Sequence, residues 1–264
     1  MLGEPQQVSA NEYDTEWVTY HQDYQNFMMI SYDAERNVNA IYTNDHLISS
    51  ESGLRYRSTK AFVREQYGIP LTEIKRGNKI YLLQNTEEFD LFEIGDLYLY
   101  VFYDVHRGDT VTSLQIVSKT LEQERKQIYA TGNTALREGF ERQLFDLTNA
   151  SRVRHGVPAL EWDDGAAITA HNHSNDMAKN NYFDHDNLQG QSPFDRLKAD
   201  NIPFRSAGEN LAYGQSSSIF AHEGLMNSKG HRDNILFDTY SHLGIGVSFN
   251  EESQPYYTEN FLLK

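Results

Sequence analysis

Residues 226–236 read MNSKGHRDNIL, and this stretch is the most informative one for the fold of the C-terminal half. The residues before it, from about 217, are expected to form a helix that Gly230 ends, because glycine commonly terminates helices. His231 then follows an element boundary, where loops present functional side chains on a rigid scaffold. An imidazole in such a place is a candidate for acid–base chemistry or metal binding.

Two other short stretches place an ionisable group at an expected boundary. They read FDHD at residues 183–186 and GENL at residues 208–211. The first follows the end of an expected helix, and the second follows a loop. His185 and Glu209 therefore join His231 as candidate site residues.

The remaining C-terminal residues are expected to form helices followed by strands. Apolar residues at helical spacing predict a helix over 134–155. Asp163 is expected to cap a second helix that runs to about residue 179, and Ser192 a third with proline at its first position. Residues 242–249 and 255–263 are expected to be strands. This order predicts an α+β fold.

These motifs together resemble, in order, the bacterial pattern of the CAP superfamily, which includes cysteine-rich secretory, antigen 5 and pathogenesis-related proteins. The matching segments are the N..R...G...L.W pattern over 149–162, YF.H at 182–185, SPFDRL at 192–197, GENLAYG at 208–214, MNSKGHRDNIL at 226–236, LGIGV at 243–247 and YTENF at 257–261. The resemblance implies a CAP (SCP) domain over residues 134–264, folded as an α-β-α sandwich with a cleft.

In that family the cleft holds two histidines and two glutamates, which in some members bind a divalent metal such as zinc. Carried over by motif, the cleft residues here are His185, Glu209 and His231, with the two histidines as metal ligands. The second glutamate does not carry over, because its position is Ser228. Glu223 lies on the same helix in a different register, so the fourth cleft residue stays open.

Structural roles compete with these functional ones. A polar cleft without metal is as consistent with the sequence as a zinc site. The segment around Glu209 and Asn210 is expected at a turn, where both side chains can anchor backbone N–H groups. His171 and His173 are two residues apart on a helix and point in different directions, so packing or surface roles are expected for both.

The N-terminal half contains an internal repeat. Leu2-Gly3-Glu4-Pro5 resembles residues 67–70, and aromatic-rich strands follow each copy. The second copy begins with an expected helix over 58–67, which the first copy lacks. We therefore expect a longer precursor that supplies this helix and, before it, an export signal or membrane anchor.

The two copies are interpreted as a sheet-rich domain of helix-plus-sheet repeats over residues 1–120, the first of them truncated. Residues 121–133 are expected to be a charged linker. The domain resembles the small domain that precedes the CAP domain in some bacilli. It also resembles repeats of the β-lactamase-inhibitor-protein type.

Composition narrows the classes of partner. The chain has 264 residues and a net charge of −15, which disfavours nucleic acids and anionic membranes. There are no cysteines, which excludes disulfides, thiolate metal sites and cysteine nucleophiles. No apolar run approaches the roughly 18 residues of a membrane span. A membrane is therefore expected as a partner only through a missing N-terminal anchor.

Two functions follow from these observations. The first is an extracellular or cell-surface binding or scaffolding module, whose cleft takes a small or cell-wall ligand such as a peptide, glycan or lipid. The alternative is a metal-dependent, protease-like hydrolase, in which His185 and His231 hold a zinc-bound water and Glu209 acts as base. The incomplete set of cleft residues favours the binding module.

Overall fold

The structure is a computed structural model that describes residues 3–76, 79–83, 87–125 and 127–264. The chain divides into two units, Met1–Ile128 and Tyr129–Lys264. Leu2, where the first copy of the expected repeat begins, lies outside the described residues. Among the described residues, no helix is both long and apolar enough to cross a membrane.

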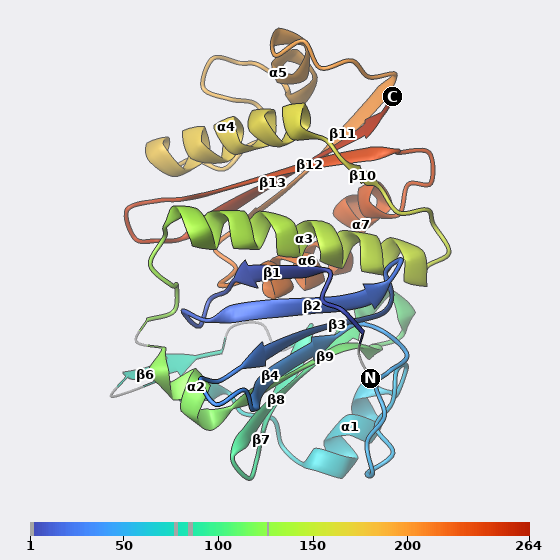
Figure 1. Cartoon of the computed structure of the whole chain (residues 1–264), viewed down its shortest axis with the longest axis vertical. Helices are drawn as coiled ribbons and strands as arrows, with labels where there is room; N and C mark the ends of the chain where they lie inside the picture. Colours follow the sequence, from blue (N-terminus) through green and yellow to red (C-terminus); the bar gives the residue numbers. More distant parts are fainter. Residues whose placement is uncertain (1–2, 77–78, 84–86, 126) are drawn as a thin grey trace. The chain divides into compact units, whose positions relative to one another are not determined.

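The first unit is built on a seven-stranded antiparallel sheet with the order β1-β2-β3-β4-β9-β8-β7 (Figure 1). Its strands are β1 (Gln7–Ala10), β2 (Glu16–Gln22), β3 (Gln25–Tyr32), β4 (Val38–Thr43), β7 (Phe89–Ile94), β8 (Leu97–Asp104) and β9 (Thr110–Ser118). The meanders β2-β3-β4 and β7-β8-β9 meet where β4 pairs with β9, with Ile41 opposite Ile116. This arrangement fits the internal repeat expected from the sequence.

Strand β8 is buried on both faces, as its apolar pattern predicts. On one face, Val101 and Tyr103 pack in a cluster with Val63 of α1 (Lys60–Tyr67). Thr59 caps this helix by accepting a hydrogen bond from the Phe62 N–H. The expected helix in the second copy is therefore present.

The segment expected to be a linker begins inside the first unit, so residues 121–125 of that prediction are wrong. They belong to α2 (Lys119–Glu124) and its C-cap. Glu122 is fully buried, and Arg76 of β5 (Glu73–Arg76) donates to its carboxylate at 2.7 Å. Strand β5 pairs antiparallel with β6 (Lys79–Leu82). The charged sequence suggested exposure, but this long-range ion pair allows the carboxylate to be buried.

The second unit is the expected α-β-α sandwich (Figure 1). Its sheet has the order β10-β12-β13-β11, so β11 is an edge strand. Helices α4 and α5 lie on one side of the sheet, and α3, α6 and α7 lie on the other. The elements are α3 (Thr134–Arg154), β10 (Glu161–Trp162), α4 (Asp164–Asn180), α5 (Pro193–Ala199), β11 (Ser206–Tyr213), α6 (Ser218–Asn227), α7 (Lys229–Ile235), β12 (His242–Phe249) and β13 (Pro255–Leu263).

Local capping explains where these helices begin. The Asp163 side chain accepts from the Ala166 N–H at the start of α4. Ser192 and Asp195 form a reciprocal capping box at the start of α5, with proline at its first position. Both caps agree with the sequence analysis, because such caps depend on residues within one turn.

Helix α4 packs on β12 at a distance that only glycine permits. Gly244 and Gly246 face the helix, and a Cβ atom at Gly246 would overlap the main chain of Ala170 and His171. The LGIGV motif therefore sets the spacing between α4 and the sheet.

Candidate functional site

Glu209 lies in the middle of β11 and not at a turn, so that part of the sequence analysis is wrong. Its main chain pairs with Asn260 of β13 in an antiparallel ladder. Gly208 suggested a turn, but the space that its Cβ would fill is taken by the Tyr240 hydroxyl. The strand holds the Glu209 side chain almost fully buried, with 1 % of its surface exposed.

The Glu209 carboxylate is engaged at both oxygens. His185 Nδ1 lies 2.9 Å from Oε1, and an Arg196 guanidinium nitrogen donates to Oε2 at 2.6 Å. A second nitrogen of Arg196 donates to the carbonyls of His185 and Gln191. Arg196 therefore holds both the carboxylate and the loop that carries His185.

His185 is the exposed member of this group, with 51 % of its side-chain surface accessible. The hydrogen bond from its ring to Glu209 raises the pKa of His185, although partial burial opposes this. The carboxylate therefore stabilises the imidazolium form of the ring relative to a free histidine. With Nδ1 held by Glu209, Nε2 is the nitrogen left to meet a ligand.

His231 approaches from the other side of the sheet edge, on α7. The expected stop at Gly230 is wrong, because α6 already ends at Asn227 and Gly230 lies within α7. The Asn210 side-chain amide donates to the His231 carbonyl and so attaches this helix to β11. Burial and the charge of nearby His185 lower the pKa of His231, so this ring favours the neutral form.

Asn210 and Asn234 connect the two sides of the site. The Asn234 amide donates to the Glu209 carbonyl and to the Asn210 side-chain oxygen. The Asn210 amide also donates to the Glu259 carboxylate at 2.9 Å. The structural role expected for Asn210 is thus consistent with these contacts.

Glu259 is a buried carboxylate behind the site that the sequence analysis missed. It is fully buried in β13 and accepts hydrogen bonds from Asn210 and Thr148. Burial raises its pKa to about 7. Glu223, the other acidic residue considered, is buried on α6 with 5 % of its surface exposed.

Arg196 and Asn234 were also missed, although both stand in motifs quoted above. SPFDRL and MNSKGHRDNIL identified the family without indicating which side chain meets Glu209. Only the packing of α5 against β11 shows that the arginine of SPFDRL is its partner. The signal was therefore present, but a basic residue in an amphipathic helix is usually solvated.

The arrangement does not fit a zinc site. Among the described residues, no three His, Cys, Asp or Glu side chains are grouped so as to hold a metal ion. Protein zinc sites use at least three such ligands, and here Glu209 is bound by Arg196 and His185. His185 and His231 alone would remain as donors.

The dependence of His185 on Glu209 leads to a first prediction. The Glu209→Gln variant should have a lower His185 pKa, because the amide keeps an acceptor but loses the negative charge. A pH titration of the imidazole NMR signals measures this. Because the native pKa of His185 is raised, the His185–Glu209 pair contributes its full stabilisation of the folded state below about pH 6.5, the pKa of an unfolded histidine. This contribution is lost as pH rises through the native pKa of His185.

Glu161→Gln is the matched control for this titration, because Glu161 is 84 % exposed and lies next to a different histidine, His242. That variant should leave the His185 titration unchanged. An unchanged His185 pKa in Glu209→Gln would show that the His185–Glu209 contact does not govern the titration.

Comparison with known proteins matches each of the two units to a protein family. Residues 1–129 match the family described as CAP-associated N-terminal, and residues 145–261 match the cysteine-rich secretory protein family, CAP. The chain is similar to the structure of an extracellular protein containing a SCP domain from Bacillus anthracis str. Ames. That match has 31 % identity and a TM-score of 0.84, and it covers 99 % of this chain and 90 % of the other.

Two proteins of Bacillus subtilis (strain 168) are also similar. The chain is 29 % identical to the uncharacterized membrane protein YlbC, over 99 % of its own length and 79 % of the relative. It is 38 % identical to the uncharacterized protein YkwD over 125 residues, which is 47 % of this chain and 48 % of YkwD. The ordered motifs, the α-β-α sandwich and these matches show that the chain belongs to the CAP (SCP-domain) family and carries the CAP-associated N-terminal domain.

Proposed function

We propose that the second unit is a ligand-binding module, with the surface around His185 and His231 as its binding site. The observation that supports this most is the state of Glu209. The Glu209 side chain is only 1 % exposed, and its two oxygens are held by the hydrogen bond with His185 and the ion pair with Arg196, so neither oxygen is open to a metal or a substrate. Glu209 is thus suited to position His185.

The two imidazoles differ in the groups that they offer. The pKa of His185 is raised by its contact with Glu209, whereas the pKa of His231 is lowered, so His231 favours the neutral form and can also accept. Exposed Phe183 and Tyr213, whose ring centroids are 5.8 Å apart, add aromatic surface next to His185 and on the same strand as Glu209. Donors, acceptors and aromatic rings together suit a peptide or glycan better than an acyl chain.

The proposed place of action is the outer surface of a bacterial cell. The similarity to an extracellular SCP-domain protein and to a membrane protein of Bacillus subtilis supports this. The first unit would act as a spacer or docking domain. Peptides and glycans of the cell wall are then the ligands within reach.

The test is a titration of the full chain with soluble cell-wall fragments that contain both glycan and peptide. We expect binding to shift the imidazole NMR signals of His185 and His231. The His185→Ala/His231→Ala variant should bind at least about tenfold more weakly, a loss of roughly 1.4 kcal/mol. His46→Ala, which removes a largely exposed histidine of the first unit, should bind normally.

One observation keeps hydrolysis as a second candidate. A histidine oriented by a carboxylate, with its other nitrogen accessible, is an arrangement used for general base catalysis. Peptide and ester substrates should therefore be offered to the same variants, with and without zinc. Hydrolysis that disappears in the double variant would replace the binding proposal, and fragments that neither bind nor react would contradict it.

A further inference from the structure

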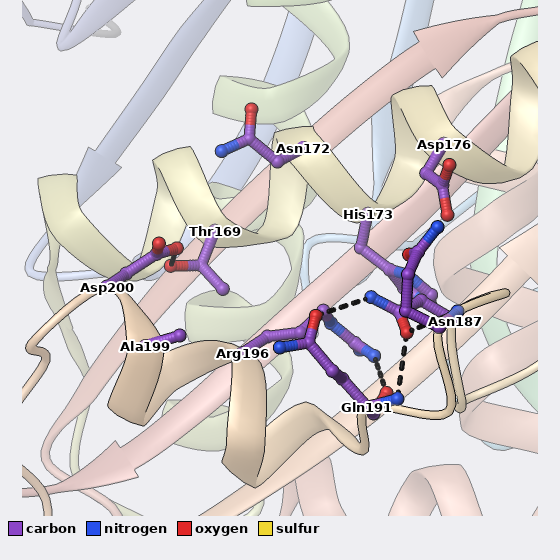
Figure 2. Close-up of a pocket in the computed structure, with 10 residues that line it drawn as sticks. Thr169, Asn172, His173, Asp176, Asn187, Gln191, Arg196, Ala199 and Asp200 are labelled. Atoms are coloured by element: carbon purple, nitrogen blue, oxygen red, sulfur yellow. Dashed lines mark hydrogen bonds between the residues drawn. The ribbon is translucent and has the colours of Figure 1, made fainter.

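One face of β11 holds His185 through a pair of opposite charges. Glu209 binds the His185 ring and is itself bound by the Arg196 guanidinium at 2.6 Å. Figure 2 shows Arg196 extending from α5 toward Gln191, whose carbonyl also accepts a hydrogen bond from it. A fixed cation therefore stands behind the carboxylate that holds His185.

The other face of β11 holds His231 through a carboxylate whose hydrogen-bond donors are neutral. Successive residues of a strand point to opposite faces, so Asn210 points away from the side on which Glu209 meets α5. Its amide donates to the His231 carbonyl and to the carboxylate of Glu259, its partner in β13. Thr148 of α3 is the second donor, at 2.9 Å. Glu259 is fully buried, yet it has two donors where a carboxylate can accept about four hydrogen bonds.

Titratable groups lie on the elements packed around Glu259, but among the described residues none offsets its charge. These groups include Arg152 of α3, His222 and Glu223 of α6, His231 and Arg232 of α7, and Glu209 of β11. From β12, the residue opposite Glu259 is the apolar Ile245. Burial raises the pKa of Glu259, and the hydrogen bonds from Asn210 and Thr148 oppose this. A glutamine would make the same two contacts without the cost of burying a charge, so the carboxylate indicates a role for that charge.

Helix α7, which carries His231, depends on polar contacts for its position. Of its seven described residues, only Ile235 is buried, and the Ser228 side chain before it caps none of the described N–H groups. Arg152 donates to the Ile235 carbonyl at one end of the helix. Asn210 binds the His231 carbonyl nearer the other end. A change in how firmly Asn210 is held therefore acts on the position of His231.

We propose that Glu259 is a positioning residue of the binding site, which holds His231 through Asn210 while it is ionised and loosens it on protonation. Charge-assisted hydrogen bonds are roughly twice as strong as neutral ones, so a proton on Glu259 weakens the contact that fixes the Asn210 amide. His185 lacks this control, because its carboxylate is paired with Arg196. The inference rests on the proposed binding site and names how that site is regulated.

The test is a pH titration of the free full chain, followed at the imidazole NMR signals of His231. We expect two inflections: one below about pH 6.5 from the ring itself, whose pKa is lowered, and a second near pH 7 from Glu259. Glu259→Gln can bond to the same two partners but cannot ionise, so it should abolish the second inflection. An inflection that instead reports the nearby charge of His185 would persist in Glu259→Gln and would overturn the proposal.

A second variant changes the titration of Glu259 without removing it. Thr148→Val takes away one donor, which favours the neutral acid, so the second inflection should move up by about one pH unit. Glu141→Gln is the matched control, because Glu141 is another buried carboxylate of this unit and binds the Val247 N–H. It should leave the second inflection in place. A second inflection that stays near pH 7 in Thr148→Val would also contradict the role of Glu259.

Binding experiments separate this inference from the proposed function. Cell-wall fragments that do not bind, together with a second inflection that Glu259→Gln abolishes, would contradict the proposed function and support the link from Glu259 to His231. If the fragments bind, the loss of affinity between pH 8 and pH 6 should be about threefold larger in the wild type than in Glu259→Gln. Equal losses in the two proteins would show that Glu259 does not regulate the site.

Discussion

The Gly246→Ala variant is expected to lose most or all of the stability of the second unit. The added Cβ would overlap the main chain of Ala170 and His171 in α4, and main chain cannot change rotamer to escape. Overpacking usually costs about 1–3 kcal/mol when flexible side chains can give way. Here the cost should exceed about 3 kcal/mol, a large share of a domain's 5–15 kcal/mol. Urea denaturation followed by circular dichroism measures it.

Gly230→Ala is the control for this effect. Gly230 lies exposed in α7, and a Cβ atom there meets nothing within 4 Å. Alanine should stabilise the helix by up to about 1 kcal/mol. Hydrogen exchange at β12 would show that the loss in Gly246→Ala belongs to the second unit. Equal unfolding midpoints for wild type and Gly246→Ala would mean that α4 does not pack as closely as described.

Arg152→Met should be the second most damaging change. Arg152 is fully buried at the end of α3, and burial lowers its pKa to about 10, so it stays charged at neutral pH. Its guanidinium donates to four main-chain carbonyls, those of Pro158, Ile235, Phe237 and Tyr240. Each buried acceptor left unpaired costs about 1–3 kcal/mol, so the four carbonyls predict a loss of at least about 4 kcal/mol in the free energy of unfolding.

The matched control is Arg142→Met on the same helix. Arg142 is exposed, and its guanidinium lies 4.3 Å from the centroid of the Trp162 ring. Losing this cation–π contact should cost no more than about 1 kcal/mol. The free energies of unfolding are measured by urea denaturation. Similar losses in the two variants would show that the hydrogen bonds from Arg152 to the four carbonyls do not stabilise the fold.

Local signals in the sequence explain the elements that were predicted well. The caps at Asp163 and Ser192 and the two C-terminal strands depend on residues close in sequence. The errors arose where distant residues decide. Gly208 and Glu209 form a strand because β13, about 50 residues later, supplies the ladder. Glu122 is buried because Arg76 lies against it.

The same division applies to the candidate site. The order of motifs was enough to single out His185, Glu209 and His231, and the structure places His185 on Glu209 with His231 near. The motifs could not show that Arg196 donates to the second oxygen of Glu209, because the sequence does not reveal which charged residues form an ion pair. The choice between a zinc ligand and a fixed hydrogen-bond acceptor depends on that contact.

The pairing of β4 with β9 has a consequence for how the first unit associates. Each meander presents the same three-strand order, and among the described strands the two meanders pair with each other through β4 and β9. If this pairing opens, β4 of one chain meets an equivalent β9 edge on any neighbouring chain. Domain swapping would then restore the hydrogen bonds between β4 and β9 across two molecules. A high protein concentration during refolding should therefore favour a domain-swapped dimer.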